Sequence, residues 1–169
     1  YGLEIIKTKN HLVGVNTHMA NKIVNHGLKS NLIKELKNNE KIKSEVFFNE
    51  ETRFDFLVEK KKQKIFIEVK NVTLFRNKET AEFPDAVTSR GSKHLLTLID
   101  AIKEGYKSYL IFLVQIQKME YFKIAKDIDY EYYKNYLAAK KAGVNFLAYR
   151  CKISPKKIYI DKKIKIVDE

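Results

Sequence analysis

The chain of 169 residues has no tryptophan, one cysteine, two prolines and six glycines. With Cys151 as its only cysteine, it cannot form an internal disulfide, which fits a reducing cytoplasm. No apolar run is long enough to cross a bilayer and no secretory signal pattern opens the chain, so we expect no membrane partner. Internal repeats and low-complexity linkers are also absent. The sequence therefore favours a single domain over residues 1–169.

Two further absences bear on function. Tryptophan, the residue that most often stacks on sugars, does not occur, and no glycine-rich phosphate loop is present. A module that binds sugars or phosphorylated metabolites is therefore the least favoured of the functions considered below.

Acidic residues are outnumbered by basic ones, and the formal net charge is +12 with a sequence pI of about 9.6. Such an excess favours polyanionic partners, nucleic acid first. Part of the lysine excess is also what A/T-rich coding sequence produces. Arginine is the more informative cation, because it is rare here and offers a planar, bidentate donor. The four arginines are Arg53, Arg76, Arg90 and Arg150.

Alternation and capping residues divide the chain into strands and helices. Thr17 is the expected N-cap of a helix to about residue 25, and Ser30 begins a second short piece. A longer helix is expected at 89–104, and Asp129 begins a helix that ends at Gly143. Strands are expected at 3–7, 11–15, 44–49, 54–60, 64–73, 109–116, 145–153 and 157–167, with a loop at 74–87.

This order predicts an α/β fold with a mixed β-sheet flanked by helices. The three strands within 44–73 are close enough in sequence to form a meander. The helix at 89–104 is then a crossover, which makes the apolar strand at 109–116 parallel to one of them and buried on both faces. The expected core is thus a helix, a three-strand meander, a crossover helix and a strand, followed by C-terminal additions.

The strands at 54–60 and 64–73 carry the most informative pattern. Alternation places six apolar side chains on one face: Phe54, Phe56, Val58, Ile65, Ile67 and Val69. A tight turn centred on Lys61 and Lys62 pairs residues whose numbers sum to 123, so Asp55 lies opposite Glu68. Their Cβ atoms are then about 4.5–5.5 Å apart. Lys70 lies two residues beyond Glu68 and points to the same side.

Two carboxylates this close repel each other unless a cation lies between them. Mg²⁺ or Mn²⁺ is expected here, because such ions are held by one or two carboxylates plus water and substrate phosphate. Asp55 and Glu68 are the predicted ligands, and Glu45 on the preceding strand is a third candidate. This arrangement suits the hydrolysis of a phosphodiester, in which a metal-activated water attacks the phosphorus. Lys70 would orient or help deprotonate that water, or stabilise the pentacovalent phosphate oxygens.

A plain ion-pair cluster on the solvated face of a hairpin is the alternative interpretation. Two features oppose it. Leu57 and Phe66 flank the charges on the same face, which indicates that this face is covered. The two acids also oppose each other rather than each opposing a cation.

Further polar residues are expected around these three. Four would contact the DNA backbone: Arg53, Arg90, Lys93 and His94, the last three in the first turns of the helix at 89–104. Arg53 could instead hold Glu68. Asn71 is expected to orient Lys70, and Asn16 opens the first helix as a supporting residue.

Three stretches resemble the sugar fermentation stimulation protein family of bacteria and archaea. They are Val13-Gly-Val-Asn-Thr-His18, Arg53-Phe-Asp-Phe-Leu57 leading into Glu68-Val-Lys-Asn-Val-Thr73, and Phe83-Pro-Asp-Ala-Val-Thr-Ser-Arg-Gly-Ser-Lys-His94. Ala148-Tyr-Arg-Cys151 and Ser154-Pro155 match as well. The resemblance spans nearly the whole chain.

The resemblance implies a restriction-endonuclease-like core with a PD-(D/E)xK-type site. On that pattern Asp55 is the strand carboxylate and Glu68-Val69-Lys70 is the (D/E)xK element, while Phe54 stands where the motif's proline would be. Full-length members carry an N-terminal OB-fold domain, which we expect to be absent here because the chain starts just before Val13. The family is described as DNA-binding and linked to sugar catabolism.

The favoured hypothesis is a metal-dependent deoxyribonuclease in the cytoplasm. The alternative is a DNA-binding regulator of sugar (maltose-type) metabolism genes that has the fold and does not cut. Two opposed acids favour the enzyme, because a pure binder has no need of them. By analogy with restriction-type cores, a homodimer is also expected.

Overall fold

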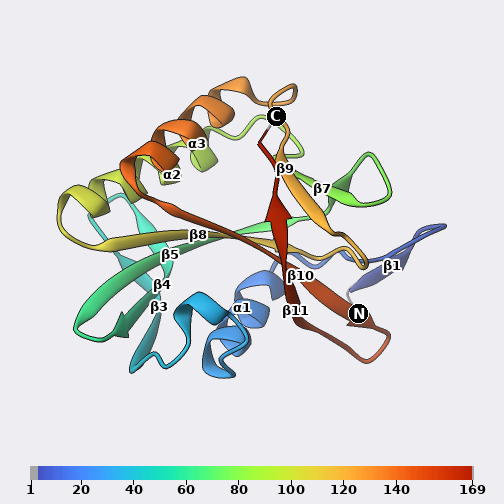
Figure 1. Ribbon diagram of the computed structural model, residues 1–169, viewed down its shortest axis with the longest axis horizontal. Helices are drawn as coiled ribbons and strands as arrows, with labels where there is room; N and C mark the ends of the chain where they lie inside the picture. The colour runs from blue at the N-terminus through green and yellow to red at the C-terminus, as the bar shows by residue number, and fades with distance from the viewer. Residues whose placement is uncertain (1–3, 169) are drawn as a thin grey trace.

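The computed structural model describes residues 4–168 and consists of a large mixed sheet with helices on both faces (Figure 1). Within these residues the sheet has nine strands in the order β3-β4-β5-β8-β10-β11-β9-β7-β6, and β1 and β2 form a separate pair. The helices are α1 (Met19–Lys29), η1 (Lys34–Leu36, a 3-10 turn), α2 (Ser89–Lys103) and α3 (Tyr130–Ala142). The strands are β1 (Ile5–Lys7), β2 (Leu12–Gly14), β3 (Lys41–Phe47), β4 (Arg53–Lys60), β5 (Gln63–Val72), β6 (Leu74–Phe75), β7 (Thr80–Phe83), β8 (Lys107–Val114), β9 (Tyr121–Ile124), β10 (Asn145–Ser154) and β11 (Lys157–Ile166).

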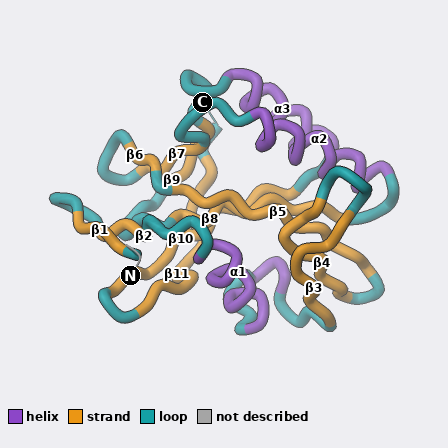
Figure 2. The backbone as a smooth tube through the Cα atoms, turned by 180° about the vertical axis from the view of Figure 1, so that it is seen from behind, coloured by secondary structure: helices purple, strands orange, loops and turns teal. Residues whose placement is uncertain are grey.

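Two apolar clusters cover the two faces of the sheet. Helices α2 and α3 lie together on one face and α1 lies on the other, as the front and back views show (Figures 1 and 2). Strand β8 contributes to both clusters, and residues 110–114 on it are fully buried. It runs parallel to β5 through the α2 crossover and parallel to β10 through α3. The predicted α/β class and the doubly buried central strand are therefore confirmed.

The β3–β4–β5 meander forms as predicted, and β4 and β5 have the predicted register as far as the Phe56–Ile67 pair, but the predicted pairing of Asp55 opposite Glu68 is not made. Strand β4 pairs antiparallel with β5 through Phe56 and Ile67, Val58 and Ile65, and Glu59 and Lys64, around the turn at Lys61 and Lys62. The ladder ends at the Phe56–Ile67 pair. Beyond it β4 continues beside β3 and β5 continues beside β8, so the two strands separate at Asp55 and Glu68.

Phe54 is not on the predicted face. Phe56 packs on the α1 side of the sheet, whereas Phe54 packs on the α2 side, against Phe66 at 5.2 Å between ring centroids. The alternation inverts at Asp55, and it inverts on β3 at the facing position, Glu45. Glu45 has a φ of 57°, in the left-handed region, and this local turn lets both strands change face together.

Several boundaries also differ from the sequence-based expectations. Within the expected loop at 74–87 the structure forms β6 and β7, and β9 was not expected at all; these strands are only 2–4 residues long and too short for alternation to be recognised. Helix α1 starts after His18 without a side-chain cap from Thr17, and it continues through Gly27 to Ser30, which ends it. The expected strand at 3–7 begins before the described residues; its described part is β1. No helix in the described range is long and apolar enough to span a bilayer.

The left-handed backbone at Glu45 predicts a specific order of stability. A β-branched residue is poorly tolerated there, so Glu45→Val should lower the free energy of unfolding by about 1–2 kcal/mol. Glu45→Asn and Glu45→Gly should stay within about 0.5 kcal/mol of the native chain, because both residues adopt this conformation and the exposed ion pair to Arg53 is weak. Urea denaturation measures all three. Equal stability of the valine and asparagine variants would contradict the assignment.

Candidate functional site

The separation of β4 from β5 opens a cavity of about 560 Å³. Its walls are the first half of α1, the ends of β3, β4 and β5, and the first turns of α2. Asp55, Glu68 and Lys70 all line it, so the structure brings the three predicted catalytic residues together. Glu45 and Asn71 line it too, as do Arg90 and His94.

Asp55 is held in place by two donors at the point where the strands part. The backbone N–H of Val69 donates to Asp55 Oδ2 at 2.7 Å, and Asn21 Nδ2 on α1 donates to Oδ1 at 2.7 Å. The carboxylate thereby takes up the Val69 N–H that β4 no longer pairs with. Burial and the nearby charge of Glu68 raise the pKa of Asp55 from 3.8 to about 6, against these hydrogen bonds.

Glu68 lies deeper, with 4% of its surface exposed. Its Oε1 accepts from Lys70 Nζ at 2.8 Å and is also bonded to His94 Nδ1. Burial alone would raise the pKa of Glu68, but the His94 hydrogen bond and the Lys70 charge together lower it below its ordinary value. The two acids of the cavity thus have pKa values shifted in opposite directions, a pattern common at functional sites.

Glu68 Oε2 is buried and has no hydrogen-bond partner within the described residues. An unsatisfied carboxylate oxygen beside a second carboxylate suits a hard divalent cation, which takes oxygen ligands and retains several waters. Within residues 4–168, however, no three His, Cys, Asp or Glu side chains converge as a ligand group. The protein therefore offers two carboxylates, and water or substrate would complete the coordination.

Glu45 does not converge with the other two acids. It lines the cavity, but its carboxylate forms an ion pair with Arg53 (Nη2–Oε2 2.8 Å), and both side chains are about half exposed. Arg53 thus holds Glu45 and not Glu68. Ligation by Glu45 would require this exposed pair to open, which costs little because such pairs contribute only about 0–1 kcal/mol.

The cations of α2 occupy different environments. Arg90 and Lys93 are exposed; Lys93 forms an ion pair with Glu51 at 2.7 Å, while Arg90 has no ion pair within the described residues. His94 is buried and faces Glu68, contrary to the expected location on an exposed helix turn. Helical spacing explains the difference, since His94 lies on the same side of α2 as Leu95 and Leu98.

Three asparagines lie in or near the cavity. Asn71 was expected to orient Lys70, but its Oδ1 accepts instead from Gln115 Nε2 at 2.6 Å. Asn16 lies outside the cavity lining, bonds Glu4 and accepts from the His18 N–H. Asn21, the α1 partner of Asp55, was missed from the sequence. An amide on the buried side of a helix was the available signal, although nothing in the sequence placed α1 against β4.

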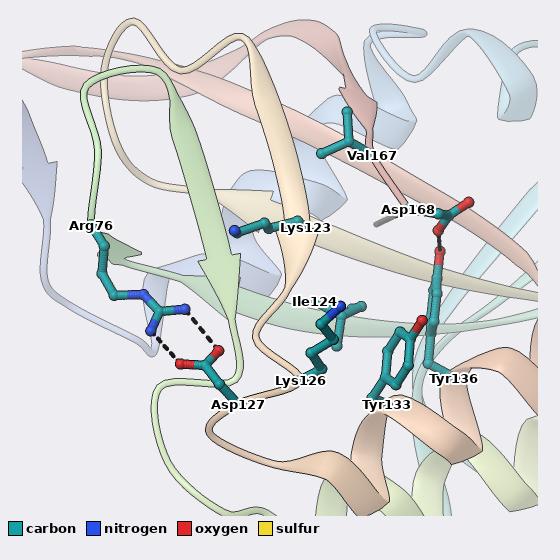
Figure 3. Close-up of a pocket in the computed structure, with 9 residues that line it drawn as sticks. All are labelled: Arg76, Lys123, Ile124, Lys126, Asp127, Tyr133, Tyr136, Val167 and Asp168. Atoms are coloured by element: carbon teal, nitrogen blue, oxygen red, sulfur yellow. Dashed lines mark hydrogen bonds and ion pairs between the residues drawn. The ribbon is translucent and has the colours of Figure 1, made fainter.

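The four arginines divide into two pairs. Arg76 donates to the buried Glu82 (Nε–Oε2 3.0 Å) and to Asp127 (Nη2–Oδ1 2.9 Å), and Arg150 pairs with Glu120 and Asp161. Figure 3 shows Arg76 at a separate cavity of about 350 Å³, where Tyr136 also donates to Asp168. None of the predicted site residues lines that cavity. Only Arg53 and Arg90 lie at or beside the cavity lined by Asp55, Glu68 and Lys70, which we call the carboxylate cavity.

A family model described as "Sugar fermentation stimulation protein RE domain" matches residues 18–157, which include every residue of the carboxylate cavity except Thr17. The chain belongs to the sugar fermentation stimulation protein family. The resemblance that the sequence motifs indicated is thereby confirmed.

Relatives and a solved structure agree with this membership. A sugar fermentation stimulation protein homolog of Pelagibacter ubique is 74% identical over 99% of this chain and 72% of its own length. The homolog of Bartonella quintana is 35% identical over 100% of this chain and 73% of its own length. The solved structure described as Pyrococcus furiosus SfsA in complex with Ca²⁺ superposes with a TM-score of 0.90 at 25% identity, covering 98% of this chain and 71% of that chain.

The raised pKa of Asp55 makes a stability prediction for the metal-free protein. The folded state binds this proton more tightly than the unfolded chain, so stability is greatest below pH 3.8 for this group and is lost as pH rises through about 6. Asp55→Asn removes that loss and keeps one acceptor for the Val69 N–H. The variant should therefore be more stable than the native chain by about 1–3 kcal/mol at pH 8 and not at pH 4. Thermal unfolding with EDTA at both pH values measures this; an unstable variant at pH 8 would contradict it.

Proposed function

We propose that this chain is a divalent-metal-dependent phosphodiesterase acting on DNA, with Asp55 and Glu68 as metal ligands and Lys70 as the third catalytic residue. The observation that carries the proposal is the carboxylate pair in one cavity, where Glu68 has a buried oxygen without a partner. Leaving a buried carboxylate unsatisfied is costly, and a cation removes that cost. The Ca²⁺ complex described for the Pyrococcus furiosus protein supports a divalent ion, and the proposed ion here is Mg²⁺ or Mn²⁺.

When bound, Mg²⁺ would supply a Lewis acid that neutralises phosphate charge and lowers the pKa of a water. The protein's own residues supply positioning. Lys70 stays next to Glu68 Oε1, and its remaining N–H groups can donate to the attacking water or to a phosphate oxygen. His94 bonds the same Oε1 and so leaves Oε2 for the ion. Asn21 and the Val69 N–H hold Asp55 opposite.

DNA is the proposed substrate because the cavity is open and bordered by cations in a chain of net charge +12. Arg53, Arg90 and Lys93 are exposed beside it, where they can bind phosphates. The ion pairs of Arg53 and Lys93 are exposed, so a phosphate can replace either carboxylate at small cost. A cytoplasmic location is proposed from the single, buried Cys151.

A non-cleaving DNA-binding regulator of sugar metabolism genes is the second candidate. The family's name favours it, since it describes an effect on sugar fermentation and no hydrolysis. In that protein the carboxylate pair would hold a structural ion.

Cleavage assays separate the two candidates. Single-stranded and duplex DNA are incubated with the native chain and Mg²⁺ or Mn²⁺, and the same with Glu68→Gln and Lys70→Met. The exposed acid Asp100 on α2 gives a matched control, Asp100→Asn. We expect each site variant to lose activity by at least about 100-fold, the control to retain it, and EDTA to abolish it. Salt-sensitive DNA binding by the native chain without any cleavage would instead support the regulator.

Metal affinity should also depend on pH through Asp55. Its carboxylate must lose a proton before it can bind a cation, and its pKa is raised to about 6. Calorimetric titration with Mn²⁺ should therefore show affinity falling about tenfold for each unit below pH 6, and little change between pH 7 and 8. The Asp55→Asn variant should lack this dependence. A constant affinity from pH 5 to 8 would exclude Asp55 as a ligand.

A further inference from the structure

A second hollow, of about 520 Å³, adjoins the carboxylate cavity. Arg90 and His94 line both, so an extended ligand that lies in one would continue directly into the other. The second hollow contains Arg53 and Lys93 as well, together with one large aromatic side chain, Phe47.

Phe47 is unusually exposed for its type. Phenylalanine is normally buried, yet 65% of this residue is accessible at the end of β3. The backbone inversion at Glu45 and Asp55 is the cause, because it turns the neighbouring Val46 and Phe54 into the core and leaves the Phe47–Arg53 pair outward. A left-handed residue and an exposed aromatic ring are both unfavourable for stability, which is the pattern expected where a surface serves binding.

One cation lies over the ring, and two more line the same hollow. The Arg53 guanidinium lies 5.7 Å from the Phe47 centroid, and Arg53 is paired with Phe47 across β3 and β4. Arg90 lacks an ion pair within residues 4–168, and Lys93 is held only by the exposed Glu51. An aromatic face with adjacent cations is the arrangement that binds unpaired nucleobases, the ring by stacking and the cations through phosphates.

We propose that Phe47, Arg53, Arg90 and Lys93 form a subsite for an unpaired nucleotide next to the scissile phosphate, so that the substrate is single-stranded or locally unpaired nucleic acid. This inference rests on the proposed function and specifies its substrate. In a duplex both faces of each internal base are already stacked, so Phe47 has no free π-face to contact. An unpaired or terminal base has the free face that stacking on Phe47 needs.

Binding measurements without cleavage test the subsite. A labelled 12-nucleotide oligothymidine and a 12-base-pair duplex are titrated in EDTA with the native chain and with Phe47→Ala, Phe47→Tyr and Leu96→Ala. Leu96 is an exposed apolar residue of α2 that lines neither hollow. We expect Phe47→Ala to weaken single-strand binding by about 5- to 100-fold and duplex binding by less than twofold. Phe47→Tyr should bind the single strand as the native chain does, and Leu96→Ala should change neither affinity.

Salt dependence separates the ring from the cations. The slope of log affinity against log salt should be unchanged in Phe47→Ala and should decrease in magnitude by roughly 0.7 in Arg90→Ala for the single strand. Equal losses on both DNA forms, no loss at all, or a change in oligomeric state by light scattering with unchanged DNA binding would overturn the subsite. If the native chain binds single strands through Phe47 but cuts nothing, the subsite stands and the nuclease proposal fails. If it cuts and Phe47→Ala binds and cuts normally, the nuclease stands and the subsite fails.

Discussion

The separation of β4 from β5 beyond the Phe56–Ile67 pair is the constraint on which the candidate site depends. Two strands that stop pairing leave backbone groups that need other partners, and a buried N–H without one is costly. Here Asp55 accepts from the Val69 N–H, so a side chain replaces the missing ladder bond. The same hydrogen bond holds the Asp55 carboxylate in the cavity opened between the strands, where it faces Glu68.

Burial then assigns different electrostatic roles to the two acids. Glu68 is the deeper one, yet His94 and Lys70 bond to it and stabilise its charge, whereas Asp55 is bonded only by neutral donors, and burial and the repulsion of Glu68 outweigh the more distant charge of Lys70. Holding both charges in the cavity near neutral pH therefore costs stability. If the proposed divalent ion binds there, its attraction to both carboxylates would offset that cost.

Arg53 and Phe47, beside the cavity, owe their outward position to the reversal of alternation on β3 and β4. When Glu45 and Asp55 reverse the alternation, Val46 and Phe54 enter the core on the α2 side. Phe47 and Arg53 turn outward beside Arg90 and Lys93 of α2. Arg76 and Arg150, by contrast, form ion pairs that join different strands and loops, Arg76 with the buried Glu82 and Arg150 with Glu120 and Asp161. The four arginines of this chain therefore fall into two groups. Arg76 and Arg150 form ion pairs within the fold, and Arg53 and Arg90 belong to an exposed cationic surface.

The fold class, the hairpin register up to the Phe56–Ile67 pair and the choice of Asp55, Glu68 and Lys70 as neighbours could be predicted from the sequence, because they follow from local alternation, a two-residue turn and an unbroken apolar strand. The sequence also carried the family motifs, since these are matters of residue identity. Three features depend on packing between distant elements: the face that Phe54 occupies, the inward direction of His94 toward Glu68, and the hydrogen bond from Asn21 to Asp55. Those contacts join residues 26–34 positions apart on elements whose relative placement depends on packing. The short strands β6, β7 and β9 could not be predicted from the local sequence, because strands of 2–4 residues have almost no periodic signal. The partners of β9 also lie far from it along the chain.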